Sequence, residues 1–397
     1  MPRILMTRPV SIPDSLKLTR YSKLPELGPR VLFFSGGSAL NGLSRTLKRY
    51  THNSIHLVSA FDSGGSSAVL REAFDMPAVG DLRSRLMALA DETVLGHPEI
   101  VRLFSYRLPK DDDDASLNKQ LERLAQGKDP LVRRIPNPMR SLICNHLGYF
   151  QQAMPHDFDL RGASIGNLIL TGGYLNNNRS LDPIIFLFSQ LVNVRGTVRA
   201  ITGDERQLMA RLQDGTRVVG QHLLTGKEVA PISSPVQRLK LVHSQQEPKP
   251  EGSKLRKANR KLLASAELIC YPPGSFYSSL MANLLVDGVG SSVADNPCPK
   301  VYIPNLGSDP EQFGMTPQQQ VEALLHYLQA DQEDPVAVSR LLNIVLLDSR
   351  FLNDVDADFK ARLAELDIQL IDMDLTDPHQ PEQYDNEKLV SALLSMT

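Results

Sequence analysis

Four glycine-rich segments, each between an apolar run and a stretch with helical spacing, limit what this chain can fold into. They are FSGGSALNGL (34–43), AFDSGGSSAVLR (60–71), RGASIGNLIL (161–170) and CYPPGSFYSSL (270–280). Glycine lets the main chain approach an anion closely, and the helix N-terminus that follows presents unpaired N–H groups and a positive dipole end. Four such strand-to-helix junctions in one chain predict a site for a phosphate-bearing ligand.

The composition is that of an ordinary globular protein, with 397 residues, 42% of them hydrophobic, and a net charge of −2. This charge gives no support to a nucleic-acid partner, which normally requires a basic surface. No apolar run approaches the roughly 18 residues of a membrane span, and the N-terminus lacks a signal peptide. The three cysteines show no C-x-x-C spacing and suit a reducing compartment. We therefore expect a cytoplasmic protein with no membrane partner.

Strands and helices alternate along the chain, which predicts an α/β fold with a mainly parallel sheet covered by helices on both faces. The strands are expected at 31–35, 54–61, 266–271, 300–306, 343–349 and 368–375. Alternating residues around Asp214 and Gly215 predict a small β-hairpin excursion from this pattern.

The chain is interpreted as one domain, residues 29–397, preceded by an extension, residues 1–28. The extension is rich in proline and either lies on the fold or stays loose. A polar stretch at about 107–160 is interpreted as an insertion, either a solvated excursion or a lid over the site.

Gly36, Gly37 and Ser38 follow the first strand. Ligands of open α/β sheets bind at this position, at the carboxyl end of a strand, although a plain tight turn is the alternative. The fingerprints G-x-G-x-x-G and G-x-x-x-x-G-K-[ST] are both absent. The sequence therefore disfavours a nicotinamide dehydrogenase and a P-loop nucleotidase.

Asp62 ends the second strand and precedes an anion-suited loop that contains Gly64, Gly65 and Ser66. A carboxylate there can hold Mg²⁺ together with substrate phosphates, or it can close the turn on its own backbone. Asp81 is the second candidate carboxylate: it is a metal ligand, or the base that deprotonates an acceptor hydroxyl, or the N-cap of the helix that follows.

The two later glycine-rich segments supply further candidates. Asn167 is placed where an amide side chain could read a base or ribose. Gly274 and Ser275 open a helix whose first turn carries Tyr277 and Ser278, and these residues offer phosphate donors without net charge. For Ser275 the alternative is an ordinary N-cap.

The ordered motifs GGS…GL, D-x-GGSS…LR, GD-x-R…LMALAD, S-x-GNL and PGS-x-Y-x-S…NLLV-x-G resemble those of the CofD-like superfamily. That superfamily comprises the 2-phospho-L-lactate transferases of coenzyme F420 synthesis and the bacterial gluconeogenesis factors. The similarity runs from about residue 30 to the C-terminus and is interrupted at 107–160.

The resemblance implies a Rossmann-like three-layer αβα fold, a homodimer, and a nucleotide diphosphate or nucleotide sugar bound at the carboxyl edge of the sheet. It also implies Mg²⁺ near Asp62 and Asp81. By motif match, the nucleotide side would comprise Gly36, Gly37, Ser38, Gly64, Gly65, Ser66, Asn167, Gly274, Ser275, Tyr277 and Ser278.

The chain departs from the family pattern, since Ser63 stands where a second acid is usual and Ala163 where a histidine is usual. These departures indicate a divergent branch. Two functions are therefore expected. The first is a Mg-dependent transferase that passes a phosphorus-containing group from a nucleotide-linked donor to an alcohol. The alternative is a regulator of carbon or cell-wall metabolism that binds a nucleotide sugar without turnover.

Overall fold

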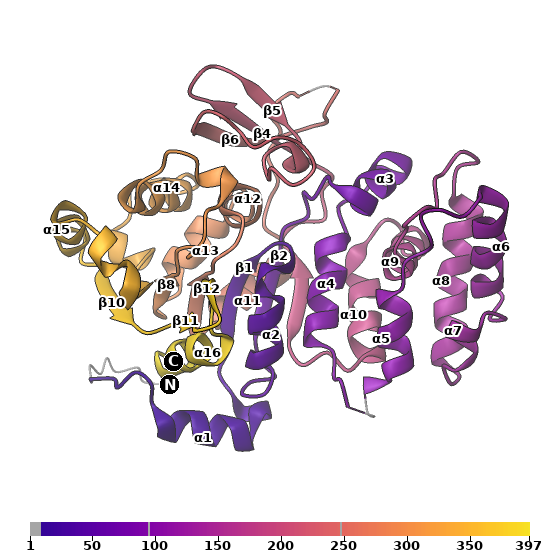
Figure 1. Ribbon diagram of the computed structural model, residues 1–397, viewed down its shortest axis with the longest axis horizontal. Coiled ribbons are helices and arrows are strands. Elements are labelled where there is room, and N and C mark those ends of the chain that lie inside the picture. The colour runs from indigo at the N-terminus through magenta and orange to yellow at the C-terminus, as the bar shows by residue number, and fades with distance from the viewer. Residues whose placement is uncertain (1–8, 94–95, 247) are drawn as a thin grey trace.

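A sheet of seven parallel strands forms the centre of the computed structural model, which describes residues 9–93, 96–246 and 248–397 (Figure 1). The strand order is β10-β9-β8-β7-β1-β2-β3. The strands are β1 (Val31–Ser35), β2 (Ile55–Val58), β3 (Thr197–Ala200), β7 (Leu268–Tyr271), β8 (Lys300–Tyr302), β9 (Ile344–Asp348) and β10 (Gln369–Met373). The predicted α/β, Rossmann-like class is confirmed; β3 is a strand that the sequence analysis did not predict.

Helices cover both faces of this sheet and extend beyond its β3 edge (Figure 1). The helices before β7 are α1 (Ser15–Lys23), α2 (Asn41–Leu47), α3 (Gly65–Phe74), α4 (Gly80–Leu89), α5 (Pro98–Ser105), α6 (Asp114–Ala125), α7 (Pro130–Arg133), α8 (Met139–Ala153), α9 (Ile165–Asn176), α10 (Leu181–Leu191) and α11 (Lys257–Ser265). Those after β7 are α12 (Ala282–Leu284), α13 (Val289–Asp295), α14 (Pro317–Gln329), α15 (Ala357–Glu365) and α16 (Asn386–Ser395).

The central strand β1 shows why this sequence forms a doubly covered sheet. All five of its residues, VLFFS, are buried, as expected of a parallel strand with helices on both faces. Because side chains alternate along a strand, Val31 and Phe33 join the core under α2 and α16. Leu32 and Phe34 face the opposite core, which α13 and α14 cover.

The predicted hairpin is present and belongs to a separate three-stranded antiparallel sheet, which we call the small sheet. Its strands are β4 (Gln207–Leu212), β5 (Arg217–Val219) and β6 (Val236–Val242), in the order β5-β4-β6. The turn between β4 and β5 lies at Asp214 and Gly215. A further pair, β11 (Thr376–Asp377) and β12 (Gln380–Tyr384), precedes α16.

The segment 107–160 is helical and packs on the rest of the molecule through its α8, which lies along α9. The contact is close, since a Cβ added at Gly172 of α9 would clash with the carbonyl of His146 in α8. Consequently the third glycine-rich segment, 161–170, follows helix α8 and not a strand, which corrects the prediction of four strand-to-helix junctions.

Residues 9–28 lie on the fold. Helix α1 packs against α16, and Asp14 donates its backbone N–H to Ser395 Oγ at 2.8 Å. The two ends of the described chain therefore meet. Within the described ranges, no helix has both the length and the hydropathy that a membrane crossing requires.

Candidate functional site

The carboxyl ends of β1 and β7 meet at the point where the strand order reverses, and ligands of open α/β sheets bind at such switch points. Two cavities of about 710 and 310 Å³ open there. Both are lined by Ser38, Lys227 and Ser275, so they form one cleft along the sheet edge. Arg107 is the only residue of the segment 107–160 that lines this cleft. This gives no support to the interpretation of the segment as a lid.

The loop after β1 presents backbone N–H groups to the cleft. Among the described residues, the amides of Gly37 and Ser38 have no hydrogen-bond acceptor. Gly36 permits a close approach of two loops, because a Cβ there would clash with the side chain of Ser279. Beneath the loop, the buried Arg85 donates from Nη2 to the carbonyl oxygen of Gly37 at 3.1 Å.

The loop after β2 is already occupied by carboxylates. Asp62 Oδ1 accepts from the Gly64 amide at 3.1 Å, which is the turn-closing role weighed as the alternative for this residue. The Gly65 amide donates to Glu228 Oε1, also at 3.1 Å. Ser66 Oγ accepts from Asn167. Two amides at the N-terminus of α3 are therefore bonded to acidic side chains.

Asp81 lies in the first turn of α4 but makes no capping hydrogen bond, so the N-cap alternative is not what the structure has. Its Oδ1 would lie 3.5 Å from a Cβ added at Gly37. Burial, and then the nearby charge of Asp62, raise the pKa of Asp81 to about 7, against the opposing charges of Arg85 and Lys227. An unpaired carboxylate of this kind is typical of functional sites.

Asn167 is buried in α9 and lines the smaller cavity. Its Oδ1 accepts from Arg83 Nε at 2.9 Å, and its Nδ2 donates to Ser66 Oγ at 3.0 Å. It thus links Arg83 and α3 beside the cleft, and one N–H of its amide has no acceptor among the described residues.

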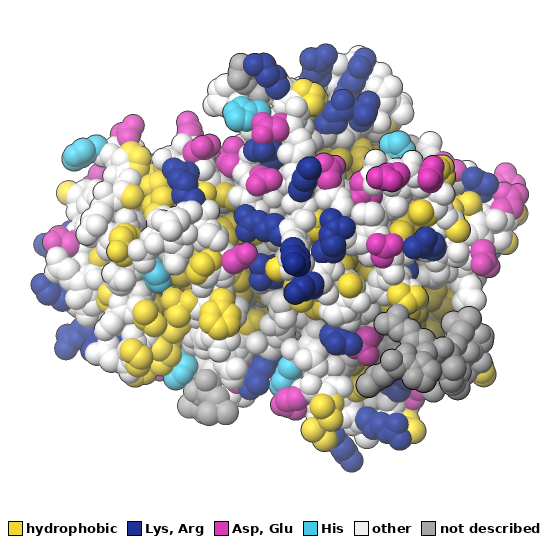
Figure 2. Space-filling view, turned by 180° about the vertical axis from the view of Figure 1, so that it is seen from behind, with side chains coloured by type: hydrophobic (Ala, Val, Ile, Leu, Met, Phe, Trp, Pro, Cys, Tyr) yellow, Lys and Arg dark blue, Asp and Glu magenta, His cyan; other side chains and the backbone are white. Residues whose placement is uncertain are grey.

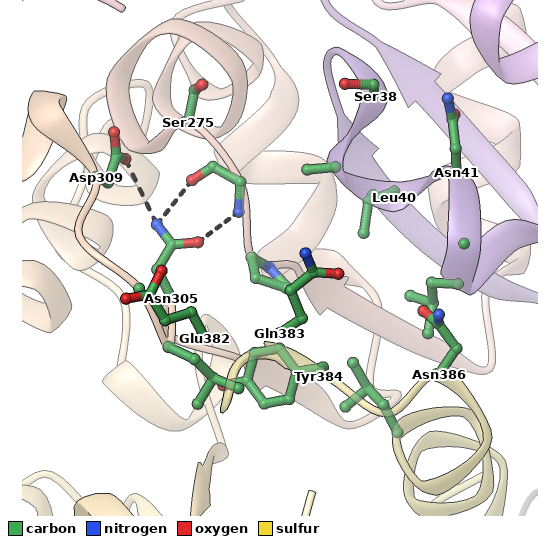
Figure 3. Close-up of a pocket in the computed structure, with 18 of the residues that line it drawn as sticks. Ser38, Leu40, Asn41, Ser275, Asn305, Asp309, Glu382, Gln383, Tyr384 and Asn386 are labelled. Atoms are coloured by element: carbon green, nitrogen blue, oxygen red, sulfur yellow. Dashed lines mark hydrogen bonds between the residues drawn. The ribbon is translucent and has the colours of Figure 1, made fainter. Parts of the chain in front are cut away.

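The loop after β7 has most of its N–H groups satisfied internally. The Gly274 amide donates to Asn305 Oδ1 at 2.7 Å (Figure 3). The amides of Tyr277 and Ser278 both donate to Glu311 Oε2, at 2.8 and 2.7 Å. Of the predicted residues in this loop, Gly274 and Ser275 line the cleft, whereas Tyr277 and Ser278 lie behind it.

Several residues of the cleft were missed by the sequence analysis. Lys227 and Glu228 come from the loop between the small sheet's β5 and β6, and Asn305 follows β8. Gln383 and Asn386 line the larger cavity (Figure 3). For Lys227 and Glu228 the sequence signal was a lone Gly-Lys-Glu in a polar loop, which cannot be placed without the tertiary fold; for Asn305 it was a partly kept family motif that begins at Asn305-Leu306.

In the part of the chain that the structure describes, no group of three or more His, Cys, Asp or Glu side chains could hold a metal ion. A divalent cation at Asp62 and Asp81 would therefore need ligand oxygens and water to complete its coordination. Mg²⁺ is commonly bound in this way, by one or two carboxylates plus substrate phosphates. The donor set fits, since Asp81 makes no hydrogen bond or ion pair with another described residue, and burial and the charge of Asp62 raise its pKa to about 7.

The chain is similar to known proteins over most of its length. It is 27% identical to the gluconeogenesis factor of Bacillus subtilis over 349 residues, which cover 87% of this chain and 86% of that protein. It is 28% identical to the gluconeogenesis factor of Listeria monocytogenes, covering 71% and 68% of the two chains. A crystal structure of a UPF0052 family member from Bacillus halodurans shares the fold, with a TM-score of 0.66, 22% identity, and coverage of 92% of this chain and 99% of that one.

A family-level match agrees with the resemblance seen in the sequence motifs. The sequence pattern described as "2-phospho-L-lactate transferase CofD" matches residues 31–382, which span the whole central sheet and most of the residues that line the cleft. The chain therefore belongs to the CofD family.

Proposed function

We propose that this protein binds a nucleotide-diphosphate-linked ligand across the carboxyl edge of its sheet. One observation carries the proposal: the acceptor-free amides of Gly37 and Ser38 lie at the switch point in a cleft that Lys227 also lines. Free amides and a lysine ammonium are the donors that diphosphate oxygens require.

The larger cavity suits the nucleoside. Its lining combines the apolar side chains of Leu40 and Leu389 with the polar side chains of Asn41, Gln383 and Asn386 (Figure 3). Small-molecule sites typically pair apolar walls with a few polar groups that fix orientation.

Asp62 and Asp81 would hold Mg²⁺ with the ligand's phosphate oxygens. When bound, the ion would neutralise charge on the diphosphate and offset the repulsion between Asp62 and Asp81.

A transferase is the second candidate function, and the pKa of Asp81 favours it. If Asp62 alone holds the ion, Asp81, with a pKa raised to about 7 in the metal-free site, can accept the proton of an acceptor alcohol while the alcohol oxygen attacks the donor phosphorus. The bond from phosphorus to the nucleotide then breaks, and the nucleotide leaves with the bonding electrons. The regulator alternative binds the same ligand without this step; two of the relatives are named gluconeogenesis factors.

A thermal-shift panel tests the proposal, with GDP, UDP, UDP-sugars and NAD, each with and without Mg²⁺. We expect nucleoside diphosphates or UDP-sugars to raise the melting temperature, because a ligand of the native state stabilises it. The variant Gly37→Ala should lose this rise in melting temperature, since the added methyl group would block the ligand's approach to the free amides. The matched control Gly148→Ala, which meets no neighbour within 4 Å, should retain it.

Stabilisation by NAD alone, or unaltered binding by Gly37→Ala, would refute the assignment. Ligand binding that is the same with and without Mg²⁺, and that persists in Asp62→Asn and Asp81→Asn, would count against transfer chemistry. It would favour the regulator.

A further inference from the structure

Three arginines stand side by side across the small sheet. Arg211 of β4 pairs in register with Arg217 of β5 on one side and with Arg238 of β6 on the other. Because neighbouring strands lie about 4.8 Å apart, the three side chains leave the sheet as a row of that spacing. We call these three residues the arginine row.

The arginine row must face outward. Leu208, Ala210 and Leu212 alternate with it along β4 and are buried in the core between the small sheet and the rest of the molecule. All three arginines are exposed, and Lys240 of β6 is half-buried on the same face. Figure 2 shows Lys and Arg side chains gathered at the top of the molecule, where the small sheet lies.

The arginine row has no acidic partner among the described residues. The nearest acid along the chain, Asp214 in the hairpin turn, accepts from the Thr216 amide at 2.8 Å. Elsewhere in the molecule many arginines are paired, as Arg206 is with Glu251 and Arg199 with Asp182.

Like charges directly opposite one another on a sheet are destabilising, typically by a few tenths of a kcal/mol up to about 1 kcal/mol. Two such pairs, Arg211 with Arg217 and Arg211 with Arg238, share one central residue. Salt screens this repulsion in part, and an anionic partner from outside the described chain would neutralise it.

We propose that the outer face of the small sheet docks an acidic helix of a partner protein. Acidic residues three and four positions apart lie on one helix face with about 5–6 Å between their Cβ atoms, close to the strand spacing of the arginine row. Carboxylates also match guanidinium groups in bidentate pairs. Met209 and Val219, which flank the row, supply a partly apolar floor beneath the helix.

Two other anionic partners fit this face less well. A single-stranded nucleic acid would call for aromatic side chains on which its bases stack, and none of the outward-facing strand residues is aromatic. A membrane would call for exposed apolar residues that insert beside the charges, and the described strands of the small sheet carry no exposed large hydrophobic residue.

Binding of a fluorescent, Glu-rich helical peptide of about 20 residues, measured by anisotropy on the full chain, tests the proposal. We expect binding that weakens at least tenfold in Arg211→Glu, and that weakens as salt is raised. The matched control is Arg123→Glu, which makes the same charge change at an exposed residue of α6. This variant should bind the peptide as tightly as the original chain does. A single-stranded RNA and phosphatidylserine vesicles are assayed in parallel.

A second measurement does not depend on the peptide. Neutralising the central charge in Arg211→Gln should raise the melting temperature, and more so at low salt, because both like-charge pairs are relieved. Peptide binding that is equal in Arg211→Glu and Arg123→Glu would overturn the proposal. So would an Arg211-dependent affinity for RNA or vesicles that exceeds the affinity for the peptide.

Discussion

At the scale of single residues, an acidic side chain of the cleft competes with an anionic ligand for a backbone amide. Glu228 Oε1 accepts from the Gly65 amide at the N-terminus of α3, where a phosphate oxygen would accept in the same way. Asp62 Oδ1 accepts from the preceding amide, that of Gly64. A phosphate-bearing ligand that approaches α3 must therefore displace a carboxylate and also meets its negative charge.

The variant Glu228→Gln should consequently bind the ligand identified in the thermal-shift panel more tightly, on the order of tenfold, because the competing group loses its charge. Isothermal titration with that ligand gives the measurement. The control Glu333→Gln removes an exposed acid that lines neither cavity and should leave the affinity nearly unchanged. Equal or weaker binding by Glu228→Gln would show that Glu228 assists the ligand and does not compete with it.

At the scale of elements, the helical turn after β7 depends on a buried carboxylate. Glu311, only 1% exposed, accepts from the amides of Tyr277 and Ser278 and from the Ser278 hydroxyl. It thus performs inside the protein the task that the sequence analysis assigned to a phosphate. Burial, and then the neighbouring Asp309, raise its pKa from 4.5 to about 7.

This raised pKa fixes the sign of a pH effect. Between about pH 4.5 and 7 the native state holds a proton on Glu311 that the unfolded state has lost, so the free energy of unfolding falls as the pH rises through that window. Glu311→Gln keeps an acceptor for both amides but cannot ionise. We expect it to match the original chain near pH 5 and to be more stable near pH 8, by on the order of 2–3 kcal/mol.

Urea unfolding midpoints at pH 5 and pH 8 check this expectation. Glu311→Ala serves as the contrast: it leaves two buried amides without an acceptor and should lose about 2 kcal/mol or more at both pH values. A pH profile of Glu311→Gln that parallels that of the original chain would contradict the assignment.

At the scale of the whole molecule, the sequence predicted the sheet well because its central strands β1, β2 and β7 are buried on both faces and are therefore mostly apolar, as in VLFFS of β1. It missed β3, whose TVRA alternates between half-buried and buried positions. The loop after β1 keeps the free amides of Gly37 and Ser38 because no described acidic side chain accepts from them. The amides of the loop after β7 are bonded, because they donate to Asn305, Asp309 and Glu311, which follow β8 in the chain. Such long-range capping leaves no local trace in a sequence.

The meeting of the two chain ends supports a final prediction. Lys17 of α1 donates to the Ser395 carbonyl at 3.0 Å, and Leu18 and Tyr21 pack partly buried on the core that contains α16. The opposite end of α16 lines the cleft with Asn386 and Leu389. Removing residues 1–24 should therefore lower the melting temperature by several degrees.

The same truncation should leave nucleotide affinity within about twofold, because the α1 contact at Ser395 lies about 13 Å along α16 from Asn386 and about 9 Å from Leu389, at 1.5 Å per residue. Calorimetry gives the stability and titration gives the affinity. A truncated chain that keeps its melting temperature would show that α1 adds nothing to the core. Lost affinity in a well-folded truncated chain would instead show that α16 transmits the contact at its C-terminal end to Asn386.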